Sequence, residues 1–150
     1  MKRRAFTLIE LLVVISIIGL LSTIAVVATN SSRIQARDVK RKADLRQISQ
    51  AIELFADANS RLPYGAGWCT YISNGAYGTG FQTNLAPYLA HLPLDPTLHG
   101  QLGDYFYDSL DSSTKYALCA KLEAATGNSY DYTGCTGGSI YNYCIYPNGQ

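Results

Sequence analysis

The chain has 150 residues, of which 47% are hydrophobic, and its formal net charge is only +1. This near balance hides an asymmetry, because residues 1–61 carry ten Lys or Arg against five Asp or Glu, whereas residues 62–150 carry two against six. The length leaves room for one modest domain beside an apolar N-terminus. The basic stretch Arg33–Arg46 keeps nucleic-acid binding open, but we interpret it as ordinary charge next to a membrane and do not expect DNA binding.

An apolar run begins directly after three basic residues, Lys2, Arg3 and Arg4. It extends to Val27, which makes it about 22 residues long, enough to cross a bilayer as one helix. The basic cluster should hold the N-terminus in the cytoplasm, so the rest of the chain is expected on the far side of the membrane. Glu10 interrupts the run near its start, and a carboxylate placed in hydrocarbon needs a partner or a function.

The helical pattern continues beyond the apolar run. Residues 6–59 contain no proline and a single glycine, Gly19. The composition then becomes charged, but apolar residues recur at helical spacing and mark one buried helix face, namely Ile34, Leu45, Ile48, Ile52 and Phe55. The sequence therefore predicts one continuous helix of about 54 residues that ends before Pro63.

The distal segment has the signals of a small α+β domain. Residues 62–88 are rich in glycine and predict a loop, which a short helix at Leu85–Leu92 should follow. Aromatic or alternating segments predict three antiparallel strands, at residues 105–107, 115–123 and 140–146, with a loop at 127–138. The middle strand should be half-buried, and the sheet should pack on the amphipathic half of the long helix.

Four cysteines lie in the distal half, at Cys69, Cys119, Cys135 and Cys144. An even number confined to one part of the chain predicts disulfides in an oxidising compartment. Three pairings are possible, and we expect Cys69–Cys119 with Cys135–Cys144, because the second bond would close a short C-terminal loop. The sequence has no CxxC and no His at ligand spacing beside a Cys, which argues against a zinc site.

Residues 4–14, RAFTLIELLVV, resemble the N-terminal signature of type IV pilins and type II secretion pseudopilins. A looser likeness extends through Ala43–Pro63, which is similar to the end of the long helix in major pseudopilins. Leu92–Pro96 resembles a turn in the same group. The C-terminal third of the chain is similar only in general style.

This resemblance implies a processing route. A membrane prepilin peptidase would cut between Ala5 and Phe6 on the cytoplasmic side and methylate the new amine of Phe6. The family usually has glycine before the cut, so Ala5 is a departure that implies less efficient cleavage. An inner-membrane assembly platform would then move the subunits into a filament of identical chains. There Glu10 would pair with the N-terminal amine of a neighbour, and the two charges would neutralise each other in an apolar bundle.

The resemblance also implies a pilin-like α+β fold, with a long N-terminal helix packed on a small antiparallel sheet head that carries a loop and disulfides. We therefore divide the chain into a leader at residues 1–5, a transmembrane or filament-core helix at 6–29, the amphipathic half of the same helix at 30–61 and a globular head at 62–150. Many family members have a proline in the middle of the apolar segment, where Val27 stands here.

The function that the resemblance implies is structural and not enzymatic, and no GxSxG or similar nucleophile motif is present. We expect a subunit of a type IV pilus-like surface filament, made as a single-pass membrane precursor and ending in an extracellular or periplasmic filament. The alternatives are a major pseudopilin of a type II secretion system and a minor pilin whose head binds DNA or a surface ligand. A different kind of alternative is a membrane-anchored protein that never polymerises into a filament.

No cofactor is expected, with one exception. Secretion pseudopilins often hold calcium in a late loop, and the segment from Asp108 to Asp111 is similar to it, so these two carboxylates are candidate ligands, although no EF-hand spacing is present. His91 and His99 are expected at the surface. All twelve tyrosines follow Pro63, and we expect them to fill sheet positions.

Overall fold

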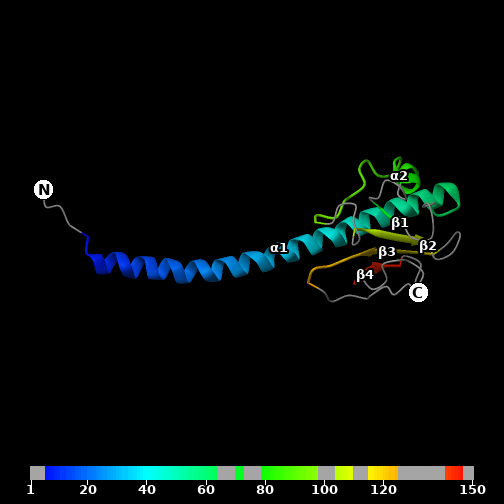
Figure 1. Ribbon diagram of the computed structural model, residues 1–150. Coiled ribbons are helices and arrows are strands. Elements are labelled where there is room, and N and C mark those ends of the chain that lie inside the picture. Colours follow the sequence, from blue (N-terminus) through cyan, green and yellow to red (C-terminus); the bar gives the residue numbers. More distant parts are fainter. Residues whose placement is uncertain are drawn as a thin grey trace. The chain divides into compact units, whose positions relative to one another are not determined.

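The computed structural model describes residues 6–63, 70–72, 79–97, 104–109, 115–124 and 141–146. The chain divides into two compact units, Met1–Ala36 and Arg37–Gln150. Helix α1, Leu8–Asn59, begins in the first unit and ends in the second, and its 52 residues confirm the predicted continuous helix. The second unit adds a short helix and a small antiparallel sheet, which confirms the α+β fold class (Figure 1).

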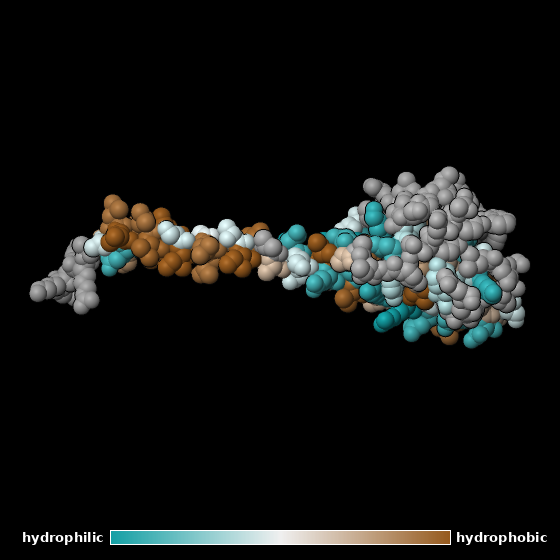
Figure 2. Space-filling model, turned by 90° about the horizontal axis from the view of Figure 1, so that it is seen from below, coloured by the Kyte–Doolittle hydropathy of each residue, from teal (hydrophilic) through white to brown (hydrophobic). Residues whose placement is uncertain are grey.

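The first unit exposes its apolar side chains. Every described side chain from residue 6 to residue 33 is exposed, and Figure 2 shows this stretch of α1 as almost continuously hydrophobic. Serine and threonine hydroxyls in it donate to backbone carbonyls three or four residues earlier, as in Ser16 to Leu12 and Thr29 to Ala25, so few hydroxyls remain unbonded on an apolar surface. By length and composition the stretch is able to cross a membrane.

The second unit contains a four-stranded sheet in the order β1-β2-β3-β4, with every neighbouring pair antiparallel. Strand β1 is Thr70–Tyr71 and β2 is Phe106–Ser109. Strand β3 is Tyr116–Ala120 and β4 is Tyr143–Ile145. Strands β3 and β4 fall inside the predicted segments 115–123 and 140–146. Strand β2 overlaps the predicted segment 105–107 but extends two residues beyond it, and β1 was not predicted.

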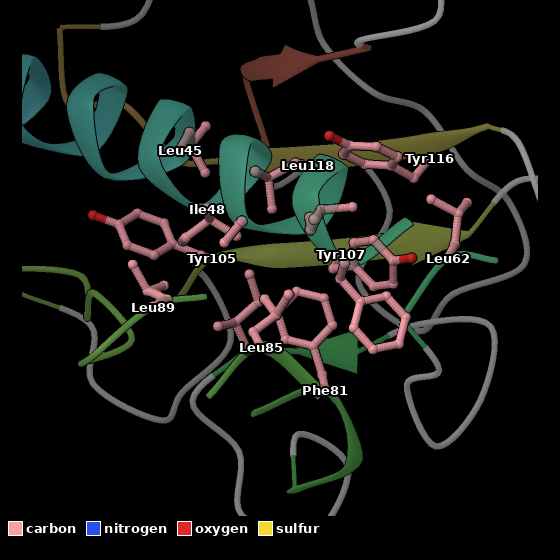
Figure 3. Close-up of a cluster of buried hydrophobic side chains, with 14 of the residues drawn as sticks. Leu45, Ile48, Leu62, Phe81, Leu85, Leu89, Tyr105, Tyr107, Tyr116 and Leu118 are labelled. Carbon is pink, nitrogen blue, oxygen red and sulfur yellow. The ribbon is translucent and has the colours of Figure 1, made fainter. Parts of the chain in front are cut away.

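One face of the sheet packs on the distal half of α1. The buried stripe Leu45, Ile48, Ile52 and Phe55 meets aromatic and aliphatic side chains of β2 and β3 (Figure 3). Tyr107 lies between Phe81 and Tyr116, with ring centroids 4.6 and 5.8 Å away. Removal of this apolar surface from water is the main favourable contribution to folding of the head.

The opposite face of the sheet is also covered. Phe106 stacks on Tyr141 with ring centroids 5.2 Å apart, and Ala117 and Cys119 are completely buried beside them. All five residues of β3 are therefore buried, so the prediction of a half-buried strand is wrong. Alternate residues of β3 do face opposite sides of the sheet, as predicted. The second side is covered by the segment at Tyr141–Tyr146, and the sequence of β3 alone cannot show that another segment packs there.

Helix α2, Thr79–Leu85, lies where the sequence predicted a loop. The short helix predicted at Leu85–Leu92 is wrong, because residues 86–92 form turns and irregular structure. The physical reason lies in Phe81 and Leu85, which stand four residues apart and are both buried in the core. Pro87 then follows the helix and has no N–H to donate to the carbonyl of Thr83, and the chain leaves the helix through a turn in which the Leu89 N–H donates to the Leu85 carbonyl at 2.9 Å. The loop predicted at residues 127–138 lies outside the described residues.

Helix α1 ends in a left-handed turn. Ser60 has φ 54°, and its N–H donates to the carbonyl of Ala56 at 2.7 Å. The Asn59 side chain donates to the carbonyl of Phe55 at 2.9 Å, which satisfies one more of the last helical carbonyls. The chain then turns so that Leu62 and Pro63 are buried, and the Pro63 carbonyl accepts from the Tyr107 hydroxyl at 3.1 Å.

Candidate functional site

The first candidate site is the start of α1. The Glu10 carboxylate accepts from the Thr7 N–H at 2.9 Å and from the Thr7 hydroxyl at 2.6 Å, while the Glu10 N–H lies 3.4 Å from the same hydroxyl oxygen. This reciprocal arrangement is a capping box, and it satisfies donors that a helix N-terminus leaves open. Phe6 precedes it and is 76% exposed. Ala5, on the other side of the predicted cut, lies outside the described residues.

The arrangement leaves Glu10 with a net charge on an apolar surface. Its neighbours Leu8, Ile9 and Leu11 are all exposed, and Glu10 takes part in none of the ion pairs of the described residues. The hydrogen bonds from Thr7 orient the carboxylate but do not neutralise it. A cation supplied by another group would therefore find an oriented acceptor here, and the apolar surroundings would strengthen the attraction.

The second site is a cluster of charged groups inside the head. Arg41 is completely buried, although arginine almost never is unless it is paired. Its guanidinium donates to Asp95 through Nε at 2.7 Å and through Nη2 at 3.2 Å. Nη1 donates to Asp38 and to Glu123, both at 2.8 Å, and Nη2 reaches the Thr97 hydroxyl at 2.7 Å.

These contacts join three separate parts of the chain. Arg41 and Asp38 stand on α1, Asp95 lies in the turn at residues 92–97, and Glu123 follows β3. Asp38 also accepts the N–H groups of Glu123 and Ala124, each at 2.9 Å. Arg37 completes the cluster with a two-point ion pair to Glu123. The cluster fastens the turn and the end of β3 to the helix.

The carboxylates of the cluster are held in their charged form. Ion pairing with Arg37 and Arg41 outweighs desolvation and lowers the pKa of Glu123 to about 2. Burial raises the pKa of Asp38 and of Asp95, but hydrogen bonds outweigh it and leave both pKa values below their usual range. The donors are the N–H groups of residues 123 and 124 for Asp38, Thr97 for Asp95, and Arg41 for both.

The sequence interpretation did not identify this cluster as a site. The signal was present, because Asp38 and Arg41 stand seven and four residues before Leu45 and so continue the buried stripe of the helix. Two charged residues of opposite sign on an otherwise apolar stripe indicate a buried ion pair. The turn at Leu92–Pro96 was noted only because it resembles a pseudopilin turn. Its Asp95 is a further partner of Arg41 in the buried cluster.

The structure corrects the predicted disulfide pairing. Cys119 is bonded to Cys144, so the expected bonds Cys69–Cys119 and Cys135–Cys144 are both wrong. The two cysteines are direct partners in the register of β3 and β4, with Cα atoms 4.1 Å apart. Strand pairing brings them together across 25 residues, whereas the prediction favoured a short loop. Cys69 and Cys135 lie outside the described residues.

The calcium candidates remain a prediction. Asp108 lies in β2 and is buried, and Asp111 lies outside the described residues. Among the residues that the structure describes, no group of three or more His, Cys, Asp or Glu side chains is placed to hold a metal ion. His91 is exposed in the turn after α2, whereas His99 lies outside the described part.

Comparison with known proteins identifies the N-terminal segment. Residues 1–26 match the family described as the prokaryotic N-terminal methylation motif. This motif is the hallmark of type IV pilin and pseudopilin precursors, and it includes the Thr7–Glu10 capping box, so the resemblance predicted from residues 4–14 is confirmed. No curated protein and no solved structure matches the chain.

Proposed function

We propose that this chain, which carries the methylation motif of a pilin-type precursor, is the structural subunit of a type IV pilus-like cell-surface filament. The observation that carries the proposal is the position of the motif. It lies at residues 1–26, directly on a helix start whose apolar side chains are all exposed. In a monomer in water such a surface would be strongly unfavourable, so it needs either lipid or other helices of the same kind.

In this proposal, Glu10 links processing to assembly. Cleavage between Ala5 and Phe6 by a prepilin peptidase creates an amine at Phe6, and methylation keeps that amine basic. The carboxylate of Glu10, oriented by Thr7, then pairs with the amine of a neighbouring subunit. An uncleaved chain has no amine at this position, so only processed subunits would satisfy the charge inside an apolar helix bundle.

The head of the subunit is suited to an exposed, oxidising location. It is closed by the Cys119–Cys144 bond and by the charge cluster around Arg41. Together these contacts tie the C-terminal end of β3 to β4, to α1 and, through Arg41, to the turn at residues 92–97. Disulfides persist outside the cytoplasm, and the basic leader would leave the head on that side of the membrane.

The test is intact mass and N-terminal sequencing of protein sheared from cells. Filaments that contain a chain beginning at N-methylated Phe6 would support the proposal. A chain that still begins at Met1 and stays in the membrane fraction would contradict it. The same preparation gives the ratio of this chain to other subunits, and a trace amount would favour a minor pilin, whose head would then be tested for binding to DNA or to a surface.

A second candidate is the major pseudopilin of a type II secretion system. It is favoured by the turn at Leu92–Pro96, which resembles that group and in which Asp95 is held by Arg41. The two functions differ in the effect of deleting the chain. Loss of surface filaments with normal protein secretion would favour the pilus, whereas accumulation of folded exoproteins in the periplasm would favour the pseudopilus.

A further inference from the structure

The basal end of the head, which we define as residues 37–42 and 121–124, is the end at which α1 enters the second unit. Its two segments lie side by side, because Asp38 accepts the N–H groups of residues 123 and 124, each at 2.9 Å. The hydroxyls of Ser49 and of Tyr116, the first residue of β3, are 3.0 Å apart. Strand β3 therefore runs antiparallel to α1, and its start lies at the opposite end of the head.

Three lysines of the basal end, Lys40, Lys42 and Lys121, take part in no ion pair among the described residues. Lys40 and Lys121 are exposed, and Lys42 is half-buried. Asp44 stands four positions after Lys40, but it is buried and accepts from the Tyr105 hydroxyl at 2.7 Å. The basal end therefore presents cations that no described carboxylate pairs with.

The acidic side chains around the basal end are already engaged. Asp38, Asp95 and Glu123 all bind Arg41, and Glu123 also binds Arg37. The two arginines and their three carboxylates carry one net negative charge, which the three lysines exceed. The exposed carboxylates of α1 in the head stand at least 11 residues beyond the basal end, at positions 53 and 57. The surface of the basal end is therefore positively charged.

The length of the helix keeps the basal end near the membrane surface in a membrane-anchored precursor. Lys40 follows Val27, the end of the apolar run, after 13 residues, so at most ~20 Å of helix separates them. The polar headgroup layer takes up about 5–8 Å of this distance, and any tilt of the helix shortens the rest. Lysine side chains extend towards headgroups, and the remaining gap is comparable with the Debye length of about 8 Å.

We propose that the basal end of the head binds the headgroups of anionic phospholipids on the outer surface of the membrane, through Lys40, Lys42 and Lys121. Each lysine or arginine close to an anionic lipid surface adds an attraction that falls off within a Debye length. The contact holds the head at the membrane until the subunit leaves it. This inference rests on the membrane-anchored precursor of the proposed function and does not depend on the filament.

The lipid selectivity of the full-length chain tests this contact. The probes are spin-labelled phosphatidylglycerol and spin-labelled phosphatidylcholine, each at trace level in phosphatidylcholine bilayers, and the motionally restricted fraction of each probe gives its relative association with the protein. K40Q/K121Q should lower the preference for phosphatidylglycerol at least about twofold. Each lysine near an anionic surface contributes on the order of a fivefold preference, and averaging over all lipids around the helix dilutes it. The leader cations are present in every form, so their contribution cancels.

The matched control is R61Q/K115Q. It also removes one exposed cation of the α1 segment and one beside β3, but both stand at the opposite end of the head. This variant should keep the wild-type preference for phosphatidylglycerol. An increase in salt from about 0.05 M to about 0.5 M should abolish the difference between the wild type and K40Q/K121Q, because the attraction is screened.

Three outcomes would contradict the proposal. Equal preferences of the inserted wild type and the inserted K40Q/K121Q would overturn this inference alone and leave the proposed function standing. A chain that alkaline carbonate extracts from the bilayers is not inserted, and this result would refute the membrane-anchored precursor as well. Binding of a short DNA duplex that is lost in K40Q/K121Q, without any lipid preference, would mean that the basal end binds nucleic acid instead.

Discussion

Arg41 and Asp95, which are 54 residues apart in the chain, form a two-point ion pair in the interior of the head. Nε of Arg41 lies 2.7 Å from Oδ2 of Asp95, and Nη2 lies 3.2 Å from Oδ1. Both residues are completely buried, so water contributes nothing to the stability of either charge. The planar guanidinium fits this geometry, and lysine would offer a single point charge in its place.

Replacement of Arg41 by Met should destabilise the head strongly. The change leaves the carboxylates of Asp38, Asp95 and Glu123 close together without their shared cation. We expect the free energy of unfolding to fall by about 3–5 kcal/mol, the range found when one partner of a buried ion pair is removed. The measurement is denaturant unfolding of the full-length chain in detergent, followed by near-ultraviolet circular dichroism of the tyrosines.

Arg46→Met is the matched control for this change. It removes an arginine from the same helix, but Arg46 is exposed and forms no ion pair among the described residues. In the detergent-solubilised monomer it should change the free energy of unfolding by less than about 0.5 kcal/mol. Equal effects of the two substitutions would show that the buried cluster does not hold the head together.

Acid should loosen the head in a defined pH range. The pKa of Glu123 is lowered from 4.5 to about 2 in the folded head, and the pKa values of Asp38 and Asp95 are lowered as well. The unfolded chain therefore binds more protons than the folded chain at acidic pH. The stability contributed by these groups is fully present above about pH 4.5 and is lost progressively as the pH falls towards 2.

Denaturant unfolding between pH 7 and pH 2.5 measures this dependence. In Glu123→Gln the slope of stability against pH between 4.5 and 2.5 should be smaller than in the wild type. Glu53→Gln, which removes an exposed carboxylate that forms no ion pair among the described residues, is the control and should keep the wild-type slope. A wild-type head whose stability is flat down to pH 2.5 would contradict the role assigned to the cluster.

Loss of the Cys119–Cys144 bond should also destabilise the head. The bond closes 25 residues, and the chain-entropy model assigns such a loop about 3.5 kcal/mol of unfolding free energy. The double variant C119A/C144A should show this loss, while α1 residues 8–36 should keep their helicity in detergent. Mass mapping of the oxidised protein should recover a linked peptide of these two cysteines, and a Cys69–Cys119 peptide would refute the observed pairing.

The sequence predicted the elements whose signals are local. The long helix follows from the absence of proline before Pro63 and from the spacing of Leu45, Ile48 and Phe55, all of which are buried in the core. The strand at residues 116–120 follows from its alternation, and Tyr116 and Leu118 do face the helix (Figure 3). These features depend on neighbouring residues only, so one sequence is enough to show them.

The features that were wrong or missed depend on contacts between distant segments. The partner of Cys119 is fixed by the register of β3 and β4, which no spacing between cysteines reveals. The burial of Arg41 depends on Asp95 and Glu123, which arrive from other parts of the chain. Helix α2 escaped prediction because its seven residues follow glycines and carry only Phe81 and Leu85 as apolar anchors.

The charge of Glu10, and not its capping of the helix, should decide assembly. Glu10→Gln keeps a side-chain oxygen that can accept from the Thr7 N–H, so α1 should still begin at the same place. Because the amide is neutral, the amine of Phe6 in a neighbouring subunit would remain without a counter-ion in an apolar bundle. We expect normal cleavage after Ala5 and at least about a tenfold loss of sheared filaments, the effect of ~1.4 kcal/mol per contact.

Thr7→Val is the complementary variant. It removes the hydroxyl that lies 2.6 Å from the Glu10 carboxylate but leaves the carboxylate charge in place. Filament yield should then fall less than in Glu10→Gln, about fivefold at most, since a lost N-cap contact typically costs about 1 kcal/mol. N-terminal sequencing and quantitative shearing of both variants decide between the two roles. Assembly that fails in Thr7→Val but survives in Glu10→Gln would mean that the capping box, and not the charge pair, is what the filament requires.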